Sequence, residues 1–101
     1  AVTAPKRVAA LPDIPAMSEV LPGFEIVGWY GVIGPAKLPK PLVTRLHDEF
    51  VKVLRQRDIH GRILEVGAEP VGSTPEEFRK FLHADVAKWA KLVKESGAKL
   101  N

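Results

Sequence analysis

The stretch "LPGFEIVGWYGVIGPAKLPKP", residues 21–41, decides the fold expected for this chain. Within it, residues 24–33 are mostly β-branched and aromatic and are bounded by turn-forming residues, which is typical of a β-strand. The run is apolar on both faces, a pattern that favours a strand buried on both sides, as in a parallel sheet covered by helices. A lone strand cannot form a sheet. Its partner strands are therefore expected to come from sequence outside these 101 residues or from a second copy of the chain.

Three helices are expected after this strand, over about residues 40–55, 58–66 and 75–96. Their apolar residues recur at three- and four-residue spacing, as on amphipathic helices. Residues 1–23 contain four prolines, so they are expected to be irregular apart from a short helix over 16–20. Residues 68–72 are a second, weaker strand candidate. The sequence thus predicts an α/β fold with one buried strand and about three helices.

The third helix has the clearest boundaries. Thr74 is placed as its N-cap, Pro75 as its first residue, and Glu77 completes a capping box three residues after the cap. Gly97 is expected to end this helix, and Gly67 to end the second one, because glycine readily adopts the left-handed conformation found at helix C-termini.

The composition excludes several classes of function. There is no cysteine, so disulfides, cysteine metal sites and thiol catalysis are absent. The net charge is +3, and residues 51–101 hold ten cations against seven anions. An acidic partner is one interpretation of this excess, but the cations alternate with acids at helical spacing, which is typical of a solvated helix surface. No nucleic-acid motif accompanies them, so no nucleic-acid partner is expected.

No constellation of catalytic or metal-binding residues is found either. His47, His60 and His83 fall on three different expected helices without the close spacing of metal ligands, so surface positions are expected for them. The glycines at 28, 31 and 34 match neither a dinucleotide fingerprint nor a P-loop. The sequence therefore predicts a protein without enzymatic activity, cofactor or metal.

Trp29 and Tyr30 are the strongest candidates for a ligand-binding role. Adjacent residues of a strand point to opposite faces. One of the two could line a cleft while the other enters the core, or both could belong to the core.

An ordered set of motifs resembles one receptor family along nearly the whole chain. The motifs are "LPDIPAMSE" (11–19), "LPGFEIVGWYGVIGPA" (21–36), "PKPLVTRL" (39–46), "GAEPVGSTPEEFRKFL" (67–82) and "WAKLVKESGAKL" (89–100). They resemble the C-terminal third of the substrate-binding proteins of tripartite tricarboxylate transporters, also called Bug receptors. Three local departures affect caps and turns. Lys37-Leu38-Pro39 replaces a Gly-Thr-Pro, Gln56-Arg57 replaces an Asp-Pro, and a residue is missing after Val20.

The resemblance implies part of a two-lobed fold like that of type II periplasmic binding proteins. Residues 1–23 would leave lobe two and approach the hinge, and residues 24–101 would form the C-terminal part of an incomplete lobe one. Such a receptor is exported to the periplasm, with its signal peptide outside this chain. It binds a small organic carboxylate and delivers it to the membrane components of the transporter. Thr3, Trp29 and Tyr30 are the candidate ligand contacts in this segment.

A second hypothesis comes from a different class of protein. The chain could be a free-standing interaction module that completes its sheet by exchanging strands in a homodimer.

Overall fold

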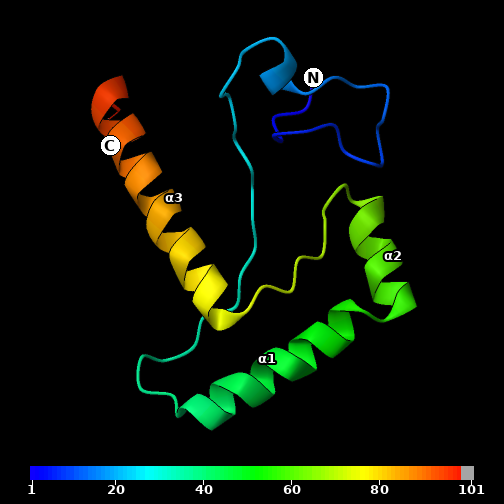
Figure 1. Ribbon diagram of the computed structural model, residues 1–101, viewed down its shortest axis with the longest axis vertical. Helices are drawn as coiled ribbons and strands as arrows, with labels where there is room; N and C mark the ends of the chain where they lie inside the picture. Colours follow the sequence, from blue (N-terminus) through cyan, green and yellow to red (C-terminus); the bar gives the residue numbers. More distant parts are fainter. Residues whose placement is uncertain (99–101) are drawn as a thin grey trace.

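The computed structural model describes residues 1–98. The last three residues of the expected domain and the end of the last motif lie outside the described part. The elements follow the order η1 (Met17–Glu19, a 3₁₀ turn), α1 (Lys40–Leu54), α2 (Arg57–Glu65) and α3 (Pro75–Ser96). Figure 1 shows α1 and α2 forming a corner, α3 rising away from it, and a long extended segment running down to α1. The three helices expected from the sequence are present.

The chain is open rather than closely packed. Its radius of gyration is 16.6 Å, against about 13 Å for a typical domain of 100 residues. Its accessible surface is 8873 Å², whereas a folded monomer of this mass exposes about 5,700 Å². Among the described residues only Ala16 is fully buried. The elements therefore form a framework whose apolar faces are largely uncovered.

The predicted boundaries of α3 are confirmed in atomic detail. The Thr74 hydroxyl accepts the backbone N–H of Glu77 at 3.2 Å, and the Glu77 carboxylate accepts the backbone N–H of Thr74 at 2.8 Å. This reciprocal pairing satisfies donors that the first turn of a helix leaves free. Gly97 ends the helix with φ +67°, and Gly67 follows α2 with φ +75°. Both glycines adopt the left-handed conformation expected of them.

The other two long helices begin without such caps. Pro39 is the N-cap of α1 and Gln56 that of α2, and neither side chain bonds to the first turn. These are the positions where the sequence departs from the motifs of the resembling family. The departures therefore leave helix-terminal donors without a side-chain partner, at a cost of about 1 kcal/mol each.

The strand predicted over residues 24–33 is not formed within residues 1–98. The segment is extended (Figure 1), but no strand is assigned among the described residues. Its one long-range backbone hydrogen bond within the described part runs from Ile26 N–H to the Thr3 carbonyl at 3.0 Å. It is also not buried on both sides, since Val32 and Ile33 are 68% and 73% exposed. A strand needs a neighbour to bond to, and residues 1–98 place none beside it.

Two smaller expectations are also corrected. Residues 68–72 form no strand, and the short helix expected over 16–20 is the 3₁₀ turn Met17–Glu19. The one sheet-like contact among the described residues is an isolated parallel bridge between Val2 and Ala16.

The amphipathic helices expose much of their apolar stripes. On α1 the stripe residues Leu42, Leu46, Phe50 and Val53 are 41–48% exposed. On α3 the exposed apolar residues are Phe81, Val86, Trp89, Leu92 and Val93. The periodicity correctly marked which residues share a face, but these faces have no covering layer within residues 1–98.

Candidate ligand-facing segment

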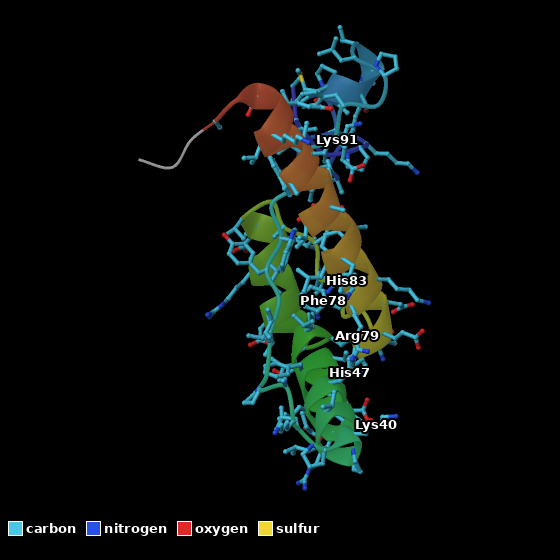
Figure 2. All side chains as sticks on the ribbon, turned by 90° about the vertical axis from the view of Figure 1, so that its left-hand side faces the viewer. Lys40, His47, Phe78, Arg79, His83 and Lys91 are labelled. Atoms are coloured by element: carbon cyan, nitrogen blue, oxygen red, sulfur yellow. The ribbon has the colours of Figure 1, made fainter. Side chains whose placement is uncertain are left out.

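The extended segment lies along one face of α3. We call residues 24–33 the aromatic segment. Its contacts fall on Phe78, Phe81, Asp85 and Lys88, which are spaced by three, four and three residues. Residues at that spacing share one side of a helix. Figure 2 shows α3 running from Phe78 and Arg79 toward Lys91. Later α3 residues meet earlier residues of the segment, since Lys88 contacts Glu25 and Phe78 contacts Gly31.

Trp29 is the centre of this contact. Its indole N–H donates a hydrogen bond to the Asp85 carboxylate at 2.9 Å, in a partly buried setting. Its ring meets Phe78 and Phe81 edge-on, with centroid distances of 5.5 Å in both cases. Edge-to-face aromatic pairs are favourable beyond the area that they bury. Trp29 is therefore held both by packing and by a charged acceptor.

Two backbone contacts flank Trp29. The Lys88 ammonium donates to the Glu25 carbonyl oxygen at 2.7 Å, on the N-terminal side of the tryptophan. On the other side, the backbone of Gly31 passes so close to Phe78 that a Cβ at this position would overlap the phenyl ring. Glycine allows a close approach of backbone to side chain. Gly31 is therefore the point where the backbone of the segment comes nearest to α3.

Tyr30 points the opposite way. It is 99% exposed, whereas Trp29 is half-buried. Within residues 1–98, therefore, only Trp29 of the two aromatic residues is packed against α3. The phenol of Tyr30 is therefore open to a ligand or to another part of the protein.

Thr3 lies beside the start of the aromatic segment. Its carbonyl oxygen accepts the Ile26 N–H, and the residue is exposed. The structure thus brings Thr3 next to the segment that carries Trp29 and Tyr30, although Thr3 is distant from both in the sequence.

The N-terminal irregular part closes on itself. We call residues 1–20 the N-terminal clasp. The Arg7 guanidinium bonds both carboxylate oxygens of Glu19 at 2.8 Å, and the Ser18 hydroxyl donates to the Pro5 carbonyl at 2.9 Å. The hydrogen bond from Arg7, supported by the Ala16 N–H, lowers the pKa of Glu19 to about 2. Bidentate arginine–carboxylate pairs fix geometry as well as charge.

The histidines do not form a second site. His47, His60 and His83 lie on three different helices; His47 is half-buried and the other two are exposed. No group of three potential metal ligands occurs within residues 1–98.

A hollow of about 250 Å³ lies between α1, α2 and the loop after α2, with Arg55 and His60 among its lining residues. None of the three sequence-predicted contacts lines it.

Asp85 and Lys88 were missed by the sequence reasoning. Asp85 lies seven residues after Phe78 and four after Phe81, so a charged residue interrupts the apolar face of α3. A charge at such a position usually has a partner. That interruption was the signal available in the sequence, but nothing local indicated that the partner would be Trp29, 56 residues earlier.

Comparison with known proteins places the chain in a family of receptors. Residues 1–98 match the family described as tripartite tricarboxylate transporter family receptor. The chain belongs to this family.

Two relatives illustrate the match. A UPF0065 protein from the tcbD–tcbE intergenic region of Pseudomonas sp. (strain P51) is 32% identical over 96 residues, covering 93% of this chain and 29% of the relative. Protein BugT of Bordetella pertussis is 29% identical over 101 residues, covering 99% of this chain and 31% of the relative. The chain thus spans about a third of the length of these relatives. Among the described residues no helix is both long and apolar enough to cross a bilayer.

Proposed function

We propose that this chain is the C-terminal part of an extracytoplasmic solute receptor that binds a small carboxylate and delivers it to the membrane components of a tripartite tricarboxylate transporter. The observation that carries the proposal is the family match over residues 1–98. The receptor would act in the periplasm, without enzymatic activity and without a nucleic-acid partner.

The open architecture supports the view that further sequence completes the fold. Within residues 1–98, the aromatic segment has α3 on one side and unpaired backbone groups along most of its length. In the proposed receptor, strands from the missing N-terminal part would pair with residues 24–33 and form a sheet of lobe one. The same strands would cover apolar surface that α1 and α3 now expose. Residues 1–23 would connect this lobe to the other one.

The ligand chemistry follows from the groups that the segment offers. A carboxylate accepts hydrogen bonds, so hydroxyl and backbone N–H donors suit it. Tyr30 supplies an exposed phenol, and Thr3 supplies a hydroxyl beside the beginning of the segment. Trp29 offers such a ligand no free side-chain N–H, because its indole N–H is donated to Asp85.

Calorimetric titration of the whole receptor with citrate, succinate, malate and glutamate tests the proposal. We expect saturable binding of at least one carboxylate and none of matched neutral amides. Failure to bind any carboxylate, in a receptor shown to be folded by circular dichroism, would contradict the proposed function.

The second candidate function is a homodimeric interaction module, and the unpaired backbone of residues 24–33 favours it. Exposed strand edges readily pair with another chain. Sedimentation of the isolated 101-residue chain distinguishes the two. A compact, stable dimer with increased strand content supports the module, whereas a weakly structured or aggregating chain supports dependence on the missing receptor sequence.

A further inference from the structure

We draw no further inference here: the strongest candidate, the hollow of about 250 Å³ between α1, α2 and the loop after α2 with Arg55 and His60 in its lining, opens beside helix faces that have no covering layer within residues 1–98, so nothing in the structure shows what covers or fills it.

Discussion

The N-terminal clasp and the aromatic segment are both irregular, but they are stabilised in different ways. The clasp, residues 1–20, is closed by its own contacts, including the Arg7–Glu19 pair and the Val2–Ala16 bridge, and contains the one fully buried residue of the described part. The aromatic segment, residues 24–33, makes most of its contacts with α3, more than 45 residues later in the sequence. One region is locally complete, and the other depends on distant sequence.

This difference shows which parts of an incomplete fold are stabilised by nearby residues and which depend on sequence far away. The short-range contacts of the clasp form within residues 1–20 and need no covering layer of further helices or strands. The aromatic segment is docked on one side by α3, yet most of its backbone donors and acceptors still lack partners within residues 1–98. The proposed missing strands would change the surroundings of the segment much more than those of the clasp.

The largest stability effect is expected where the segment backbone touches α3. Gly31→Ala places a methyl group into the Phe78 ring, and overpacking of this kind costs about 2 kcal/mol. Gly28→Ala is the matched control, because a Cβ there has no neighbour within 4 Å. It should be neutral or slightly stabilising. Urea unfolding of both variants measures the difference, and equal stabilities would show that the segment does not dock on α3 as described.

A smaller effect is expected at the start of α3, which carries the docking face. Thr74→Ala removes the side-chain acceptor of the N-cap, and such losses cost about 1 kcal/mol. Thr44→Ala on α1 is the control, since the Thr44 hydroxyl bonds only the Lys40 carbonyl within its own helix, an arrangement that adds little stability. Thermal unfolding that is equally sensitive to both substitutions would contradict the assigned cap.

The smallest effect is expected in the clasp, because the Arg7–Glu19 pair is exposed. The folded-state pKa of Glu19 is about 2, below the ordinary value of 4.5, chiefly because Arg7 bonds the carboxylate. The pair's contribution to stability is therefore present above pH 4.5 and is lost as the pH falls toward 2. Because the pair is exposed, screening by solvent keeps its contribution to stability small.

Carboxyl carbon NMR titration of the wild type and Arg7→Gln measures this shift directly. The Glu19 pKa should rise in the variant and remain somewhat below 4.5, because the Ala16 N–H still donates to it. Glu77 is the internal control, since its pKa is lowered by the Thr74 backbone and hydroxyl rather than by Arg7. An unchanged Glu19 pKa in the variant would show that the clasp is not closed by this pair.

The elements that could be predicted from the sequence are those whose causes are local. The capping box of Thr74 and Glu77 spans three residues, and Gly67 and Gly97 end helices through their own backbone freedom. The three helices and their apolar faces follow from periodicity for the same reason. Residues 24–33 have strand-like composition but form no strand within residues 1–98, because strand pairing requires a neighbour that these residues do not provide.

The candidate site was predictable only in part. Trp29 and Tyr30 stood out as adjacent aromatic residues between glycines, and the sequence also indicated that they would point to opposite sides. The sequence left open whether Trp29 or Tyr30 would be the exposed side chain. That choice depends on Asp85, Phe78 and Phe81, which approach Trp29 only when α3 folds back along the segment.

The sequence by itself determined the helices, the cap of α3 and the membership of a receptor family, because these depend on neighbouring residues or on ordered motifs. The tertiary structure alone decided that Trp29 packs on α3 while Tyr30 is exposed within residues 1–98. The physical reason is distance along the chain: the indole N–H finds its charged acceptor 56 residues away, and no local pattern specifies such a pairing.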